Sequence, residues 1–292
     1  MKYVLLLSIA LLVVCALTAP LHAATYYATP TGGGAGTSCA SGKLISTIWT
    51  SLVAGDTMKL CDGTYTGTNS MLVPPAGKSG TSGNPITIEA VNDGAVLIDG
   101  QSARIPVNMG GGKNWWVLRG FNACCSTADV FANFQSDHNR YERVIGWDAC
   151  VGTGNCAVFA PTGTGNTFVD FAAWGKGRKA VGRIHDTGTV MLRGFAMKVQ
   201  GPDNNGGVPA TWTYKSYDAL TLNMIVTEDL NGLGILDNFG LFAPDHYNGD
   251  GALGTVTVTM KGNIAYHVDG QAIGPAQTVM QLHVNPANID TG

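Results

Sequence analysis

The sequence predicts an all-β solenoid, a parallel β-helix, because one short phrase recurs at multiples of a single period. Leu118-Arg119-Gly120-Phe121 returns as Leu192-Arg193-Gly194-Phe195, and more loosely as Met260-Lys261-Gly262-Asn263-Ile264. Gly120 and Gly194 are 74 residues apart, and Gly194 and Gly262 are 68 residues apart. Each interval divides into three steps of roughly 23 to 25 residues, and a β-rich repeat of that length buries its apolar face by stacking on copies of itself.

The composition favours the same fold class. Glycine accounts for 40 of the 292 residues, and charged residues make up 13% of the chain. Abundant glycine, with many threonines and asparagines, suits short strands that are joined by tight turns. The net charge of −3 gives no attraction to nucleic acid or to anionic membranes, so neither is expected as a partner.

One amphipathic helix is expected near the start of the solenoid, over residues 44–53. Its apolar residues recur at helical spacing: Leu44, Ile45, Ile48, Trp49 and Leu52. A terminal coil leaves its apolar interior and its edge strand open. We therefore expect this short helix to cap the N-terminal end.

Strand-like segments occupy the rest of the chain, and Gly, Asn, Asp, Ser and Pro punctuate the gaps between them. They lie at residues 25–29, 57–61, 85–90, 95–98, 104–108, 115–123, 140–148, 166–174, 180–184, 189–199, 217–227, 233–238, 254–267 and 277–284. Two longer breaks, 70–84 and 200–216, are expected to leave the coil and to build a binding face.

No linker-like change in composition interrupts the chain, so residues 24–292 are expected to form a single domain. Some nine or ten coils would make a rod of roughly 45 Å, since stacked strands lie about 4.8 Å apart. Little sequence follows the last expected strand, which predicts either an oligomeric contact through the C-terminal end or a longer chain.

Residues 1–23 are typical of a secretory signal peptide. Lys2 precedes an apolar run, Val4 to Leu17, which is too short to span a membrane. No other segment is apolar enough to cross a bilayer. The mature protein is therefore expected to be soluble and secreted, to the periplasm or beyond the cell.

Six cysteines remain after the leader, and an even number in an exported chain predicts disulfides. Two pairs close short loops and are expected to bond: Cys39–Cys61 and Cys150–Cys156. Cys124 and Cys125 are adjacent and are not expected to bond to each other. The spacings contain no C-x-x-C pair, which disfavours a metal site.

Several phrases resemble the entry of extracellular right-handed parallel β-helix proteins of the broad pectate-lyase-like group. They are Tyr26-Tyr27-Ala28-Thr29-Pro30, Ala54-Gly55-Asp56-Thr57, Asp62-Gly63-Thr64-Tyr65, Gly83-Asn84-Pro85-Ile86-Thr87-Ile88-Glu89-Ala90 and Ile98-Asp99-Gly100. The resemblance implies a right-handed solenoid. It also implies a polysaccharide lyase, a glycoside hydrolase, a uronate epimerase or a surface adhesin. The chain lacks the Asp-Asp and Gly-His-Gly signatures of the pectin-hydrolysing members.

Eliminative cleavage of an acidic polysaccharide needs a base, a cation that neutralises the carboxylate and an acid for the leaving oxygen. One cluster concentrates suitable groups: Lys176, Arg178, Lys179, Arg183 and His185. In the lyase hypothesis, Arg183 with its basic neighbours neutralises the substrate carboxylate. His185 or Lys215 then takes the proton. The alternative interpretation of this cluster is a solvated basic turn.

Further candidates come from later coils. Sugar contacts are expected from Trp212, Tyr214 and Tyr217. Trp147 and Trp174 could stack on sugar rings as well, but stacking in the core is the favoured interpretation. Of the adjacent Trp115 and Trp116, one ring is expected inside and the other outside. A calcium ion could be held by Asp237, Asp245 and Asp250. Two other functions stay open. One is a glycoside hydrolase that uses carboxylates around Asp218, Asp237 and Asp245. The other is a non-catalytic carbohydrate-binding or surface protein.

Overall fold

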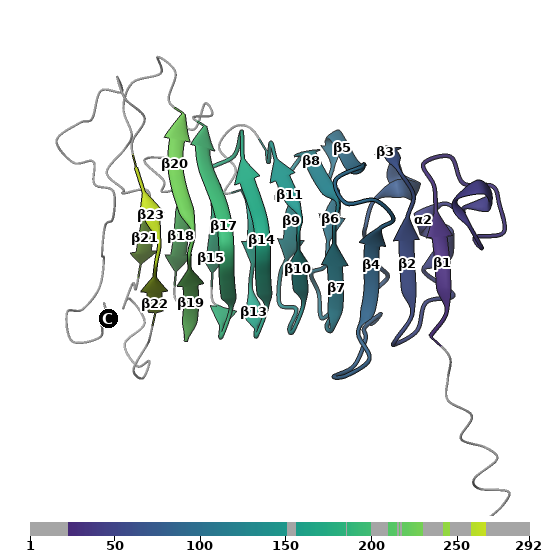
Figure 1. Cartoon of the computed structure of the whole chain (residues 1–292), viewed down its shortest axis with the longest axis horizontal. Helices are drawn as coiled ribbons and strands as arrows, with labels where there is room; N and C mark the ends of the chain where they lie inside the picture. The colour runs from purple at the N-terminus through teal and green to yellow at the C-terminus, as the bar shows by residue number, and fades with distance from the viewer. Residues whose placement is uncertain are drawn as a thin grey trace, which may run out of the picture.

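The computed structural model describes residues 23–150, 156–184, 186–199, 210–214, 216, 218–229, 242–245 and 258–266. These residues wind into an elongated solenoid in which the strands of successive coils stand side by side (Figure 1). Every pairing between named strands is parallel. The predicted parallel β-helix is therefore confirmed.

The strands form three stacks that run along the solenoid. The first stack contains β1 (Thr25–Ala28), β2 (Thr57–Leu60), β4 (Ile86–Ala90), β7 (Trp116–Arg119), β10 (Arg140–Glu142), the first halves of β14 (Thr167–Trp174) and β17 (Val190–Val199), β19 (Ala219–Leu222) and β22 (Val258–Lys261). The second stack contains β3 (Gly63–Tyr65), β5 (Val96–Arg104), β8 (Asn122–Ser126), β11 (Ile145–Trp147), the second halves of β14 and β17, β20 (Ile225–Asp229) and β23 (Ile264–Ala265).

The third stack completes each coil. It contains β6 (Val107–Asn108), β9 (Phe131–Asn133), β12 (Ala157–Pro161), β15 (Lys179–Ile184), β18 (Thr211–Tyr214) and β21 (Phe242–Asp245). A separate two-stranded sheet pairs β13 (Gly163–Thr164) with β16 (Asp186–Thr187). The sequence did not predict β3, β9, β12 or β18 as strands. The segment 200–216 was expected to be an excursion, but its residues 211–214 belong to the coil.

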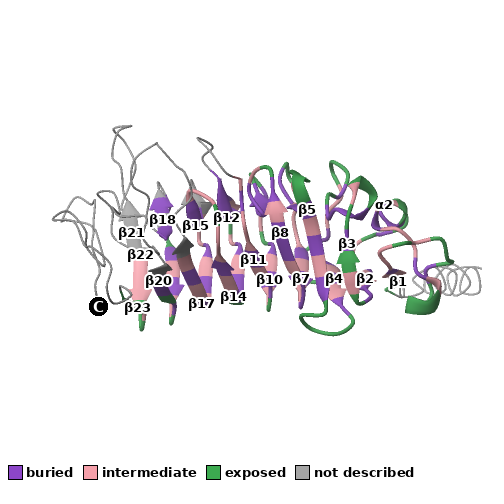
Figure 2. Cartoon of the chain, turned by 90° about the horizontal axis from the view of Figure 1, so that it is seen from above, coloured by how far each residue is buried: buried purple, intermediate pink, exposed green. Residues whose placement is uncertain are grey.

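The interior is filled by apolar side chains from all three stacks. Aromatic rings repeat from coil to coil: Phe131 stacks on Phe159 and Tyr141 stacks on Phe168, each with a centroid distance of 4.5 Å. Burial alternates along the strands of the first two stacks, as the purple and pink bands of Figure 2 show. Solenoid stability therefore comes from side chains that no single coil could bury alone.

A left-handed residue marks the corner between the first and second stacks in successive coils. The corner residues that have positive φ are Gly120, Arg143, Asp170, Arg193, Asn223 and Gly262. The expected strands 115–123, 140–148 and 217–227 are each split in two at this corner. The two Leu-Arg-Gly-Phe phrases are displaced by one residue, because Leu118 shares its stack position with Met191 and not with Leu192.

The helix expected over residues 44–53 is present as a single turn, α2 (Ile45–Ile48). Ile45, Ile48 and Leu52 are fully buried, so the apolar spacing reflects packing against the core. Two short 3-10 turns, η1 (Cys39–Ser41) and η2 (Thr68–Ser70), lie nearby in the chain. The role of α2 as a cap stays a prediction. Among the described residues, none of the helices has the length and apolar character needed to cross a membrane.

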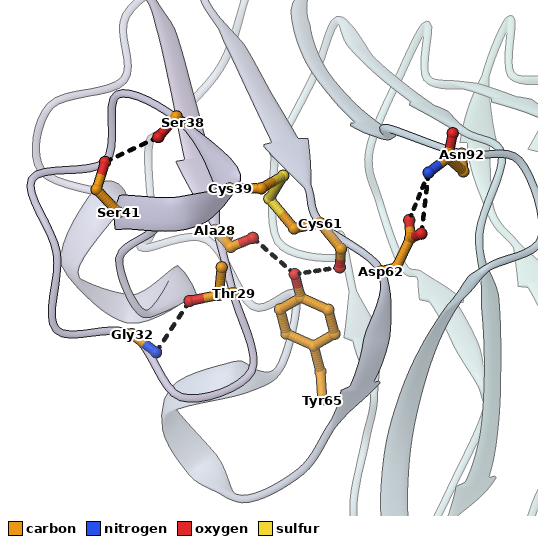
Figure 3. Close-up of a disulfide and its surroundings, with 10 residues drawn as sticks. All are labelled: Ala28, Thr29, Gly32, Ser38, Cys39, Ser41, Cys61, Asp62, Tyr65 and Asn92. Carbon is orange, nitrogen blue, oxygen red and sulfur yellow. Dashed lines mark hydrogen bonds between the residues drawn. A yellow bond between two sulfur atoms is a disulfide. The ribbon is translucent and has the colours of Figure 1, made fainter.

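Both predicted disulfides are present, Cys39–Cys61 and Cys150–Cys156. Figure 3 shows that Cys39–Cys61 ties the first coil to the loop of η1, beside the Tyr65 hydroxyl. This hydroxyl lies 2.7 Å from the Ala28 carbonyl oxygen and 2.8 Å from that of Cys61. Burial raises the pKa of Tyr65. Disulfides are typical of proteins from oxidising compartments.

Candidate functional site

The outer surface of the second stack carries the candidate site. Asp99, Cys124, Trp147 and Trp174 occupy the same register position in four successive coils. The residues that precede the last three, Ala123, Gly146 and Ala173, are all buried. Because side chains alternate across a strand, this register position faces outward at Asp99, Trp147 and Trp174, whereas Cys124 is buried.

Two tryptophans form the centre of this surface. The rings of Trp147 and Trp174 stack with a centroid distance of 5.5 Å and an interplanar angle of 6°. Both side chains are partly exposed, in contrast to Trp116, which is fully buried. From the sequence, stacking in the core is the favoured interpretation of both rings, with a surface position as the alternative. The structure instead places a rigid aromatic pair on the surface, where one sugar ring after another could pack against it.

A groove of about 280 Å³ opens at the corner that follows these strands. It is lined by Ser102, Cys125, Ser126, Thr127, Asp148, Ala149, Cys150 and Lys176. Asp148 directly follows Trp147 and accepts a hydrogen bond from the Lys176 backbone N–H at 2.9 Å. The groove therefore sets a carboxylate and an exposed ammonium group beside the tryptophan pair.

Cys124 and Cys125 form a disulfide, which the sequence analysis did not expect. In an extended strand, adjacent side chains would point to opposite faces. Cys125 instead adopts a left-handed backbone with φ of 61° at the corner. This change of direction brings both sulfur atoms together. Cys124 is 2% exposed, and Cys125 lines the groove.

Ion pairs cover the outer face of the first stack. The pairs are Lys59–Glu89, Arg119–Glu89, Arg140–Glu142, Arg143–Glu142, Arg143–Asp93 and Arg193–Asp170. Arg193 donates to both oxygens of Asp170, at 2.6 and 2.9 Å, and this contact lowers the pKa of Asp170. Each cation named in these pairs already has a carboxylate partner. We therefore assign this face to stability and not to ligand binding.

The predicted basic cluster is divided by the fold. Lys176 is exposed and lines the groove, as a substrate-binding cation would. Arg178 is partly buried, and its backbone N–H donates to the Cys156 carbonyl oxygen at 3.0 Å. Lys179 is only 2% exposed, which differs from its expected place on the surface. Residues 179–182 of β15 are all buried, so side chains do not alternate between interior and solvent along this part of the strand.

Lys179 lies in the interior, where its positive charge lowers the pKa of Asp129 and so opposes the effect of burial on that pKa. Burial raises the pKa of Asp129, while the backbone N–H of Ala157 and the charge of Lys179 act to lower it. The Ala157 N–H donates to Asp129 Oδ1 at 2.7 Å. The charge of Lys179 therefore offsets part of the rise that burial causes in the pKa of Asp129.

The other predicted residues are located by backbone alone or lie outside the described residues. Arg183 in β15 pairs with Thr213 in β18, and β18 pairs in turn with β21. This stacking places the backbones of Trp212, Tyr214 and Asp245 in coils that follow Arg183. The remaining residues lie outside the described part: His185, Lys215, Tyr217, Asp237 and Asp250. Asp218 is exposed.

Among the described residues, the one grouping of potential metal ligands is Asp99 with Cys124 and Cys125. Both sulfur atoms are already joined in a disulfide. The calcium ligands predicted from Asp237, Asp245 and Asp250 stay a prediction.

The sequence contains a signal that favours the surface position of the tryptophan pair over the core. Trp147 and Trp174 are 27 residues apart, a step that also separates Tyr141 from Phe168 in adjacent coils. Each follows a small residue, Gly146 or Ala173, which fits the interior better than an indole does. Two such dipeptides one coil apart indicate a pair of outward-facing rings.

Comparison with known proteins identifies the fold. No protein-family model matches the chain, and no curated protein matches it in sequence. Solved structures do match. A pectate lyase, Pel9A, is 16% identical, with a TM-score of 0.51, over 92% of this chain and 78% of that chain. A rhamnogalacturonan lyase is 12% identical, with a TM-score of 0.51, over 90% of this chain and 86% of that chain.

A third match is XylC in complex with xylose, at 10% identity and a TM-score of 0.57, over 88% of this chain and 68% of that chain. This chain has the parallel β-helix fold of pectate-lyase-like proteins. At these identities the likeness establishes the fold. The activity must be argued from the site.

Proposed function

We propose that this protein is an exported polysaccharide-active protein that holds a sugar chain against the outer surface of β11 and β14. The observation that carries the proposal is the parallel, partly exposed pair of Trp147 and Trp174 beside the groove. Rigid aromatic rings bury the apolar face of a ligand at a low entropic cost. A few polar groups at the edge then fix its orientation.

The groove favours an acidic sugar. Lys176 is exposed there and can pair with a uronate carboxylate, while the Asp148 carboxylate can accept hydrogen bonds from sugar hydroxyls. Two of the similar solved structures, a pectate lyase and a rhamnogalacturonan lyase, support the same class of ligand. Lys176 is the predicted substrate-binding residue on which the proposal now depends.

The reaction that we propose is β-elimination. A base removes the proton next to the carboxylate, the bond to the glycosidic oxygen breaks, and the electron pair forms a carbon–carbon double bond. An acid protonates the leaving oxygen. We assign the neutralising charge to Lys176 and Arg183, and the base to His185 or Lys215. Calcium held by Asp245 and its neighbours would supply further positive charge.

Non-catalytic binding is the second candidate function. Among the described residues, the groove brings one exposed cation, Lys176, to the tryptophan pair. One cation suffices for recognition of an acidic sugar. Elimination needs a separate base as well, so the two candidates differ in whether a second titratable group reaches the bound chain.

The experiment uses residues 24–292 with pectate, alginate and chondroitin in separate reactions, with calcium and again with a chelator. A rise in ultraviolet absorbance from the new double bond supports elimination and names the substrate class. Released reducing ends without absorbance would replace elimination by hydrolysis. Binding without either signal would favour the non-catalytic function. Absence of binding to all three polysaccharides would overturn the proposal.

A further inference from the structure

Cys124 shares its register column with the tryptophan pair but is itself buried, and Cys125 is the half of the disulfide that reaches the surface. Cys124 in β8 pairs in register with Trp147 in β11, which pairs with Trp174 in β14. The three side chains therefore succeed one another along the solenoid, one per coil. Asp99 precedes Cys124 in this column, and its Oδ1 lies 3.9 Å from Cys124 Sγ. A carboxylate thus ends the apolar part of the column.

The corner beyond this column is built to expose part of the disulfide. Cys125, Asp148 and Gly175 follow the three paired residues and share the corner position, each with positive φ. Cys125 is partly exposed and lines the groove with Asp148 and Lys176. The groove therefore has a disulfide in its wall and opposite charges beside it.

A disulfide between adjacent residues has the properties of a sugar-contact surface. Its sulfur atoms are polarisable and offer at most weak hydrogen bonding. The bond closes a small ring through the backbone, so the group holds one shape before a ligand arrives. An indole ring combines the same two properties, apolar contact and rigidity. Cys125, at the corner, therefore adds one apolar group to the two rings of Trp147 and Trp174, so that three successive coils each contribute one.

We infer that the Cys124–Cys125 disulfide is a sugar-contact site, one coil from Trp147. In this arrangement the bound chain runs along the solenoid axis over β8, β11 and β14. Its polar groups meet Asp148 and Lys176 in the groove. The inference rests on the proposed function, because it extends the same surface by one coil toward the N-terminus and gives the chain a direction.

The first test compares the affinity of variants for hexagalacturonate by calorimetry. The double variant Cys124→Ala/Cys125→Gly removes the disulfide and keeps a residue that suits the left-handed corner, as Gly175 does in a neighbouring coil. We expect an affinity loss of about tenfold. The control Gln135→Gly changes another exposed left-handed residue, with φ of 53°, on a different corner. It should bind like the unchanged protein.

The variant Trp147→Ala distinguishes a failure of this inference from a failure of the proposed function. If Trp147→Ala weakens binding and the cysteine variant does not, the inference fails and the proposed function stands. If neither variant weakens binding, the proposed function fails, and the inference fails with it.

A second measurement needs no variant. The rate at which a phosphine reduces each disulfide is followed by thiol alkylation and mass spectrometry. Hexagalacturonate should slow the reduction of Cys124–Cys125 at least severalfold and leave Cys39–Cys61 unaffected. Equal rates at Cys124–Cys125 with and without a saturating concentration of the sugar would overturn the inference.

Discussion

Asp93 reaches past the coil of Gly120 to pair with Arg143. Arg143 Nε lies 2.5 Å from Asp93 Oδ2, and a Cβ atom at Gly120 would lie 2.2 Å from Asp93 Oδ1. Gly120 also has a φ of 74°. The glycine of the repeated phrase therefore serves two needs at once, a left-handed corner and room for an ion pair between coils.

We predict that Gly120→Ala lowers the free energy of unfolding by about 2 kcal/mol, since the left-handed backbone and the collision both oppose it. Denaturant unfolding measures the change. The matched control is Gly111→Ala, which has a φ of 80° and open space around the added Cβ. Gly111→Ala reports the backbone effect alone. Equal losses in the two variants would contradict the role given to Asp93.

Buried asparagines connect three coils. The backbone N–H of Trp116 donates to Asn139 Oδ1, and the backbone N–H of Asn139 donates to Asn166 Oδ1, each at 2.9 Å. Asn139 and Asn166 have no exposed surface. We predict that Asn166→Ala leaves a buried N–H without a partner and lowers the free energy of unfolding by about 2 kcal/mol.

The control for this change is Asn92→Ala. Asn92 is exposed, and its side chain donates to both oxygens of Asp62, at 3.1 and 2.9 Å. A loss of less than about 0.5 kcal/mol is expected at such a surface site. A comparable loss in both variants would show that the buried asparagine bonds contribute no more to the free energy of unfolding than a surface bond does.

Lys176 and Lys179 offer a contrast between neighbouring lysines. We predict that Lys176→Ala weakens the binding of acidic sugar severalfold and changes the melting temperature little, because the side chain is exposed. Lys179→Ala should lower the melting temperature, because it removes a cation that acts on the buried Asp129. Calorimetry and thermal unfolding of both variants measure the two effects. The reverse pattern would contradict the assignment of the two lysines.

The pair of Asp170 and Arg193 predicts a dependence on pH. The folded state lowers the pKa of Asp170, so its contribution to stability is present above the ordinary aspartate pKa and is lost as the pH falls through the lowered value. The unchanged protein should therefore melt slightly higher than Asp170→Asn near neutral pH, and the difference should vanish in acid. Both side chains are exposed, so the effect is small and salt weakens it. A difference that persists in strong acid would show that the ion pair is not its cause.

The sequence predicted the fold, most first-stack strands and two disulfides, because repeats, alternation and loop closure are local signals. It missed β9 and β12, whose residues are all buried and so do not alternate. It misplaced Lys179 for the same reason, since β15 is buried along four residues. The disulfide of Cys124 and Cys125 depends on a left-handed corner residue, which only the coil geometry reveals.

For the tryptophan pair, the sequence favoured the wrong one of two interpretations. Burial of a large ring is usually favourable, so a core position was preferred to a surface position for both. Gly146 and Ala173 occupy the interior instead, where the space between packed side chains admits only small residues. A Cβ atom at Gly146 would lie 2.6 Å from a methyl group of Val158, which leaves the indole on the next residue to face outward.

The most direct test of the central claim is the affinity of Trp147→Ala/Trp174→Ala for pectate, measured by calorimetry against Trp115→Ala. Trp115 is also partly exposed, and it stacks on His138 at 4.2 Å on a different corner. The account predicts a loss of at least about tenfold for the double variant and unchanged affinity for Trp115→Ala. Unchanged binding by the double variant, or an equal loss in Trp115→Ala, would contradict a sugar site at β11 and β14.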